Sequence, residues 1–232
     1  MKTLTFIIGF ILPFSLSACS GNFNSSVVRN LKDFNGIEVG GGINVYLTQG
    51  KEYYVEVIAE EKILEEVKTE VSGDVLKIFR KNSSWFNWSS GSIKVYVTTP
   101  SVEYLSSSGG SNVYGENNFN SSDIVIRSSG GSDIKISVNA NNVEISSSGG
   151  ADVHISGTAE FVKASSSGGS DINCYDLVAK TAELHSSGGS DIQMTVTEEL
   201  DARSSGGSDI YYKGNPEKVH ADSSGGSDVH KR

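Results

Sequence analysis

Cysteine and tryptophan are scarce in this chain, and long apolar runs are missing from it. Cys19 and Cys174 are the two cysteines among 232 residues, and the tryptophans are also two. If Cys19 is consumed by a modification, Cys174 has no partner in the chain for a disulfide. The apolar run Leu4–Leu12 is too short to span a membrane.

Positive charge is also in short supply. The chain has 19 Lys and Arg against 28 Asp and Glu, a formal net charge of −9. Nucleic-acid binding needs a basic stripe, which this sequence does not have, so that class of partner is excluded. The motifs Gly-x-Ser-x-Gly, His-Glu-x-x-His and Cys-x-x-Cys are absent as well, which argues against the enzymes that they mark.

Glycine and serine, in contrast, are abundant and regularly placed. Seven near-identical copies of Ser-Ser-Gly-Gly-Ser-Asp-Ile occupy the second half of the chain, 18 to 21 residues apart. A period of this length predicts one structural unit per repeat, stacked on its neighbours. The first glycines of the copies are Gly109, Gly130, Gly149, Gly168, Gly188, Gly206 and Gly225.

The residues between the motifs alternate between apolar and polar, which is the period of a strand with one buried face. Val143 and Ile145 precede one Gly-Gly pair, and Val153 and Ile155 follow it. No helix-length segment separates such strands, so a chain of βαβ units is excluded. The pattern predicts an all-β protein built as a right-handed parallel β-helix, with about 19 residues per rung.

Each Gly-Gly pair is expected to form a sharp corner, because glycine tolerates positive φ and close backbone approach. The serines before it are expected to hydrogen-bond along the rod axis as a ladder. The chain should then return through a loop, such as Val138–Asn142 or Gly214–Lys218.

The front of the chain reads as an export signal. Lys2 precedes the apolar run, and Leu16-Ser17-Ala18-Cys19 resembles the lipobox of bacterial lipoproteins. The resemblance implies cleavage after residue 18 and lipidation of Cys19; the alternative is an ordinary signal peptide with a chance cysteine. Residues 19–30 are then interpreted as the lipidated cysteine and a flexible tether.

Residues 31–100 are predicted to form a β-rich head that caps the solenoid, which takes residues 101–232 and is continuous with it. Alternating strands are expected at Tyr53–Ile58, Val75–Phe79 and Ile93–Val97, with one short amphipathic helix at Glu60–Lys68. A cap is needed because an open end of a solenoid recruits other strands.

The head contains the run Gly42-Ile43-Asn44-Val45-Tyr46-Leu47-Thr48-Gln49-Gly50. Phe34, Ile37 and Val39 precede it, and the spaced apolar residues of Val75–Ile78 and Ile93–Pro100 follow it. This pattern resembles the "putative auto-transporter adhesin, head GIN domain" family. The resemblance implies a right-handed β-helix-like fold, often behind a lipoprotein signal, and a role in adhesion; it supplies no catalytic residues.

Three candidate sites follow from the sequence. Trp85, Phe86 and Trp88 lie in the polar loop Lys81–Ser92, where aromatic rings could stack on sugars or enter a partner interface. The alternative is that this loop folds back as a lid on the head. Cys174 stands in a slot that other rungs fill with Ile or Met, so a buried hydrophobe is favoured over a reactive thiol.

The third candidate is a column of corner aspartates that could bind a cation such as Ca²⁺. The alternative, which we favour, is that each carboxylate accepts backbone N–H bonds at its own corner, so no cofactor is expected. Stacking would bring these carboxylates about 5 Å apart. The column consists of Asp133, Asp152, Asp171, Asp191, Asp209 and Asp228.

The sequence therefore favours a non-catalytic lipoprotein of the bacterial cell envelope, anchored in the outer membrane through lipid, that acts as an adhesin for a glycan or a protein. Whether it faces outward or toward the periplasm stays open. An assembly component with no external ligand is the alternative, and a polysaccharide-active enzyme is a weaker third. The last rung ends near Val229, which suggests end-to-end self-association.

Overall fold

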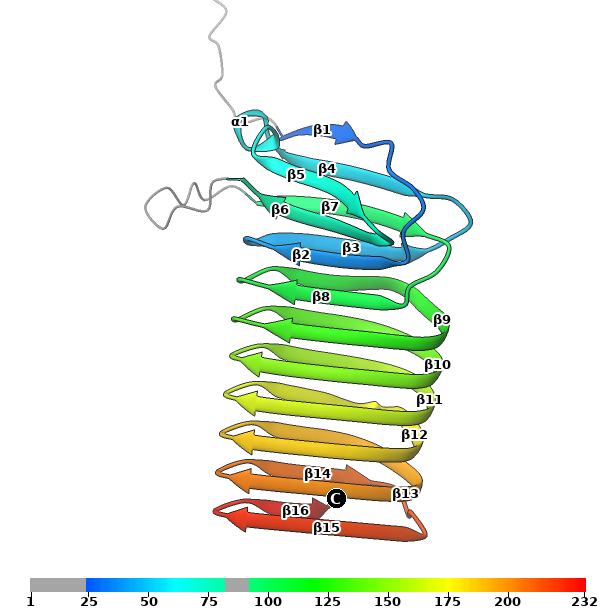
Figure 1. Ribbon diagram of the computed structural model, residues 1–232, viewed down its shortest axis with the longest axis vertical. Helices are drawn as coiled ribbons and strands as arrows, with labels where there is room; N and C mark the ends of the chain where they lie inside the picture. Colours follow the sequence, from blue (N-terminus) through cyan, green and yellow to red (C-terminus); the bar gives the residue numbers. More distant parts are fainter. Residues whose placement is uncertain (1–23, 82–91) are drawn as a thin grey trace, which may run out of the picture.

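The structure is a computed structural model that describes residues 24–81 and 92–232 (Figure 1). Strands account for 76% of it and one short helix is present. No helix in the described part of the chain is long and apolar enough to cross a membrane. The predicted all-β solenoid, with about seven turns roughly 19 residues apart, is confirmed.

The rungs of the shaft are formed by long strands that wrap from one Gly-Gly corner to the next. Neighbouring strands pair in parallel with equivalent residues in register, so that Ile134 lies beside Val153 and Val153 beside Ile172. The full rungs are β9 (Asn112–Ser129), β10 (Asp133–Gly149), β11 (Asp152–Gly168), β12 (Asp171–Gly188) and β13 (Asp191–Gly206).

The prediction of a return loop is wrong at most rungs. Val138–Asn142 lies inside β10, because the parallel pairing with β9 and β11 continues through this rounded bend. Only the last turn breaks there. β14 (Asp209–Lys213) ends before Gly214, and β15 (Lys218–Gly225) begins at Lys218, so the loop predicted at Gly214–Lys218 is present.

Each rung contributes to two walls that face each other across the core. We call the wall that follows the corners the Asp wall and the wall that precedes them the Ser wall. Inward side chains from both walls are buried: Ile134, Val153 and Ile172 come from the Asp wall, and Ile145 and Leu184 from the Ser wall. Burial of apolar area of this kind is the main stabilising contribution to the fold.

The head continues both walls rather than forming a separate body (Figure 1). β3 pairs with the Asp-wall half of β9, and β8 joins β2 to the Ser-wall half of β9. β6 and β7 form the next rung outward, and β4 and β5 pair antiparallel on them. The bounds of these strands are β2 (Gly36–Gly40), β3 (Ile43–Gln49), β4 (Tyr54–Glu60), β5 (Val67–Ser72), β6 (Val75–Arg80), β7 (Ile93–Thr99) and β8 (Tyr104–Ser108). At the other end of the shaft, β16 (Asp228–Lys231) pairs with β14.

Two predictions for the N-terminal part need correction. The helix α1 covers only Glu61–Leu64, because Val67 already belongs to β5, where it is buried. The predicted tether, residues 19–30, also includes a strand. β1 (Asn24–Val28) pairs antiparallel with β4, and Val27 packs against the core.

Candidate functional site

The corners of the shaft are built from two glycines and two inward serines. The Ser166 hydroxyl donates to the carbonyl of Ser170 at 2.7 Å, and the Ser170 hydroxyl donates to the carbonyl of Ser167 at 2.9 Å. The first glycine of every pair has positive φ, from +61° at Gly109 to +87° at Gly188. Most hydrogen bonds of the corner serines therefore join residues of the same corner.

The ladder along the axis is expected from the serines before the glycines; of these, Ser108 donates across rungs, to the carbonyl of Val39 at 3.4 Å, and the other cross-rung bonds come from the serine after the glycines. The Ser132 hydroxyl does reach the carbonyl of Ser107 in the preceding rung at 2.9 Å, and Ser227 does the same to Ser204. At the Gly149–Gly150 corner, the position after the glycines, which Ser132 and Ser170 hold in other corners, is occupied by the buried Ala151. The corner tolerates that loss because the Ser147 hydroxyl still donates to the carbonyl of residue 151 at 2.9 Å.

The serine-rich ends of the same strands line a groove on the Ser wall, with outward serines at its surface and the buried inward serines Ser147, Ser166, Ser186 and Ser204 at its base. It has a volume of about 490 Å³ and runs across five neighbouring rungs, parallel to the shaft. We call it the serine groove. Its lining residues are Ser146, Ser147, Ser148, Ser165, Ser166, Ser167, His185, Ser186, Ser187, Arg203, Ser204, Ser205, Asp222 and Ser224.

The chemistry of the serine groove is that of hydrogen bonding with few net charges. Serine hydroxyls both donate and accept, Arg203 only donates, and Asp222 only accepts. The size of the groove is in the range of small-ligand sites. Such a surface suits a polyhydroxylated or peptide-like partner that lies along the shaft. The sequence signal for the groove is a set of small side chains at outward positions that other rungs fill with His185 or Arg203, and it becomes readable only once the register is known.

The corner aspartates stack on the Asp wall in the predicted column. Three of the six carboxylates accept backbone N–H bonds, but from the next rung rather than from their own corner. Asp171 accepts from the N–H of Asp191 at 3.1 Å, Asp191 from that of Asp209 at 3.0 Å, and Asp209 from that of Asp228 at 2.9 Å. The column begins with Asn112, which accepts from Asp133 in the same way at 3.1 Å.

Three tyrosines form an aromatic stack on the Asp wall of the head, which the sequence did not predict. The rings of Tyr46 and Tyr96 lie 5.0 Å apart and nearly parallel, and Tyr114 lies 5.6 Å from Tyr46. Tyr96 is 37% exposed. The three positions are adjacent in the strand register, which explains the stack once the pairing is known.

Cys174 is fully buried on the inward side of β12, beside Met194 in the register. Burial raises the pKa of its thiol to about 12. A neutral, inaccessible thiol is a poor nucleophile. The interpretation of Cys174 as a packed core residue therefore agrees with its surroundings.

The remaining predicted site residues lie outside the part of the chain that the structure describes. These are Cys19, with its predicted lipid, and the aromatic group Trp85, Phe86 and Trp88. The strand before the aromatic segment, β6, ends at Arg80, and the strand after it, β7, begins at Ile93. Both of these strand ends lie on the side of the molecule where the Gly-Gly corners are (Figure 1).

Comparison with known proteins settles the family. The family model described as putative auto-transporter adhesin, head GIN domain, matches residues 33–216. This chain belongs to that family. The match includes the Gly42–Gly50 run and nearly all of the shaft, so the resemblance inferred from the sequence is confirmed.

Solved structures share the fold over nearly the whole chain. A putative adhesin from Bacteroides fragilis has a TM-score of 0.85 at 24% identity, covering 91% of this chain and 98% of that one. A putative adhesin from Parabacteroides merdae has a TM-score of 0.72 at 18% identity, covering 90% and 96%. A putative lipid binding protein from Parabacteroides distasonis has a TM-score of 0.68 at 20% identity, covering 92% and 98%. No curated protein matches the chain.

Proposed function

We propose that this protein is a lipid-anchored, non-catalytic adhesin of the bacterial outer membrane that binds its partner along the side of the shaft. Family membership supports an adhesive role. The observation that carries the proposal is the serine groove, an elongated hydrogen-bonding surface repeated over five rungs. Its ligand class is a glycan, because hydroxyl-lined surfaces with few charges match the hydrogen-bonding groups of sugars.

The position of the groove fits this role. β1 starts at Asn24, five residues after the predicted lipidation site Cys19, and it lies at the head end of the rod (Figure 1). A lipid on Cys19 would therefore hold the head near the bilayer. The serine groove, on β10 to β15, takes the five rungs of the shaft that lie farthest from that end. A partner on another surface would meet these rungs first.

The arrangement of polar groups favours binding over catalysis. Active sites are local exceptions to a repeat, with a nucleophile or base whose pKa differs from its ordinary value. Here the outward polar residues recur from rung to rung, and the strongly perturbed thiol, Cys174, is sealed in the core. These features support a surface that recognises a partner by many weak contacts.

The test is a double substitution that fills the groove without touching the core. Ser167→Tyr with Ser187→Tyr places two rings on exposed positions of the groove. Lys135→Tyr on the Asp wall, also exposed, is the matched control. Purified full-length proteins are applied to an array of microbial and host glycans and to a panel of extracellular matrix proteins.

We expect glycan binding by the native protein and by Lys135→Tyr, and at least a tenfold weaker signal from the double variant. Unchanged glycan binding by the double variant would show that the serine groove is not the binding site. Binding to a matrix protein alone would replace the glycan with a protein ligand.

A second role, assembly with other envelope components, is favoured by one observation. All eight residues of β15 are exposed, and Val219 is 45% exposed. Of the described strands, only β13 pairs with β15, so its other edge can accept a further strand. End-to-end association predicts a dimer mass in light scattering at high micromolar concentration; a monomer mass would contradict it.

A further inference from the structure

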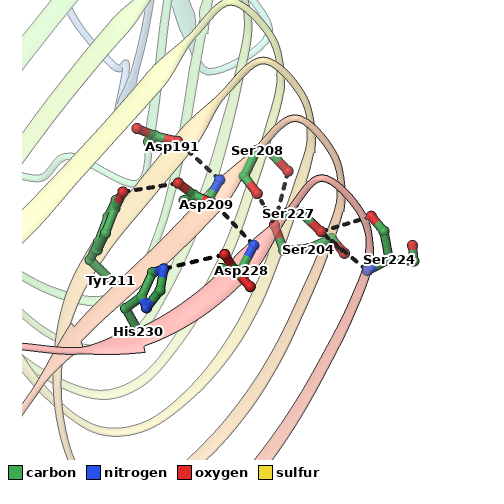
Figure 2. A network of polar contacts seen from close by, with 9 residues as sticks. All are labelled: Asp191, Ser204, Ser208, Asp209, Tyr211, Ser224, Ser227, Asp228 and His230. Atoms are coloured by element: carbon green, nitrogen blue, oxygen red, sulfur yellow. Dashed lines mark hydrogen bonds and ion pairs between the residues drawn. The ribbon is translucent and has the colours of Figure 1, made fainter.

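At the last corner of the shaft, three side chains bring metal-binding atoms together. They are Asp209 on β14, and Asp228 and His230 on β16 (Figure 2). One ligand atom from each lies within 4.8 Å of the other two. In the described part of the chain, this is the one such group of His, Cys, Asp and Glu side chains.

Two of these three side chains, Asp209 and His230, are held in place by neighbours. The hydroxyl of Tyr211 donates to Oδ2 of Asp209 at 2.9 Å, and the N–H of Asp228 donates to Oδ1 of Asp209 at 2.9 Å. The imidazole of His230 stacks on the ring of Tyr211, with centroids 5.6 Å apart and planes at 17°. Tyr211 therefore orients both Asp209 and His230, as outer-shell partners of metal ligands do.

The charges around the group favour a cation. His230 Nε2 lies 3.6 Å from Oδ2 of Asp228, and Asp191 continues the carboxylate column on the other side. Of the two nearby cationic side chains, Lys231 donates to Asn215 at 2.8 Å, whereas Arg232 lies 4.5 Å above the ring of Tyr211, so that its positive charge stays beside the group and opposes part of this attraction. A divalent ion would offset the repulsion between neighbouring carboxylates.

We propose that Asp209, Asp228 and His230 bind a divalent transition-metal ion of the zinc type, with water completing the coordination. An imidazole nitrogen beside two carboxylates suits Zn²⁺, Cu²⁺ or Ni²⁺, whereas Ca²⁺ and Mg²⁺ prefer sites made of oxygen alone. The ion would join β14 to β16 and so hold the last strand on the shaft. This site is independent of the proposed adhesive role, because it lies on the Asp wall.

The chain contains its own control for this site. Asp133, Asp152 and His154 have the same register relation, one rung apart, as Asp209, Asp228 and His230. The difference lies beside the imidazole. His230 faces Tyr211, whereas His154 faces Lys135. The positive charge of the Lys135 ammonium repels a metal ion, so the earlier triple is not expected to bind.

The experiment is calorimetric titration of untagged full-length protein with Zn²⁺ alone, and then with Ca²⁺ alone. We expect one Zn²⁺ per chain, at least a tenfold loss of affinity in His230→Gln, and native affinity in His154→Gln. Tyr211→Phe, which keeps the ring but removes the hydroxyl, should weaken binding about tenfold. Circular dichroism establishes that each variant is folded.

Three results would overturn the proposal. The first is the absence of Zn²⁺ binding by the native protein. The second is an equal loss of affinity in His154→Gln and His230→Gln. The third is Ca²⁺ binding as tight as Zn²⁺ binding and unaffected by His230→Gln, which would assign the cation to the aspartate column instead.

Discussion

Each coil of the shaft bends twice, and the two bends are built in different ways. At the corner, the sequence Ser-Ser-Gly-Gly-Ser recurs in every copy except the one with Ala151, and glycines with positive φ turn the chain sharply. At the opposite bend the sequences differ from rung to rung, and the strand stays paired while it curves. A sharp turn demands particular residues, whereas a rounded one can be made from many.

Side-chain ladders accompany the rounded bend. The amide of Asn139 donates to Oδ1 of Asn120 at 3.3 Å, and the hydroxyl of Thr158 donates to Oδ1 of Asn139 at 3.0 Å. At Gly157 and Gly214 the backbone of the preceding rung leaves no room for a Cβ, and at Gly115 a Cβ would lie 2.6 Å from the ring of Phe119. The two bends therefore predict different responses to the same substitution.

The largest effect is expected from Gly157→Ala at the rounded bend. An added Cβ would lie 1.9 Å from the carbonyl oxygen of Val138, and φ is +115°. Because both the strain and the overlap involve backbone, we expect the free energy of unfolding to fall by about 3 kcal/mol or more. Urea denaturation measures it. A loss below about 1 kcal/mol would mean that the bend is softer than the geometry implies.

A smaller effect is expected from Gly188→Ala at a corner. Its φ is +87°, and a Cβ would lie 3.1 Å from both the nitrogen and the oxygen of Gly168. We expect a loss of about 1–3 kcal/mol in the same assay. Gly150→Ala is the control, since nothing lies within 4 Å of its Cβ and its φ is not positive. That variant should stay within about 1 kcal/mol of the native protein.

The pH dependence of stability should report the burial of Cys174. Its thiol has a pKa of about 12 in the folded protein against 9.0 for the free group. Above pH 9 the unfolded chain therefore loses this proton first, and the free energy of unfolding falls by up to about 1.4 kcal/mol per pH unit. Cys174→Ala should show a shallower slope between pH 9 and 10 in urea denaturation. Identical slopes would contradict the assignment.

The smallest effect is expected from the corner serines. Ser170→Ala removes a hydroxyl that donates to the carbonyl of Ser167, at a cost of about 1 kcal/mol. Ala151→Ser introduces the hydroxyl at the equivalent position of another corner and should change stability by less than that. Thermal unfolding of each variant and of the native protein measures these two changes in stability. A large loss in Ala151→Ser would show that this corner differs from the others.

The repeat made the shaft predictable from sequence, because the period and the alternation each point to the same stacked strands. Val138–Asn142 was predicted as a loop because nothing in its polar residues signals that pairing continues. The serine groove and the Asp209–Asp228–His230 group depend on which side chains become neighbours across rungs. That neighbour relation follows only from the register, as does the contact of Tyr211 with Asp209 and His230. β1 was missed because its partner, β4, lies far along the chain.

The central claim, adhesion to partners outside the cell, depends first on where the shaft is displayed. Protease shaving of intact cells, followed by detection of the shaft, measures this directly, with a periplasmic protein as the control. We predict digestion of the shaft while the periplasmic control survives. Protection of the shaft until the outer membrane is opened would contradict the adhesin and leave an internal envelope role in its place.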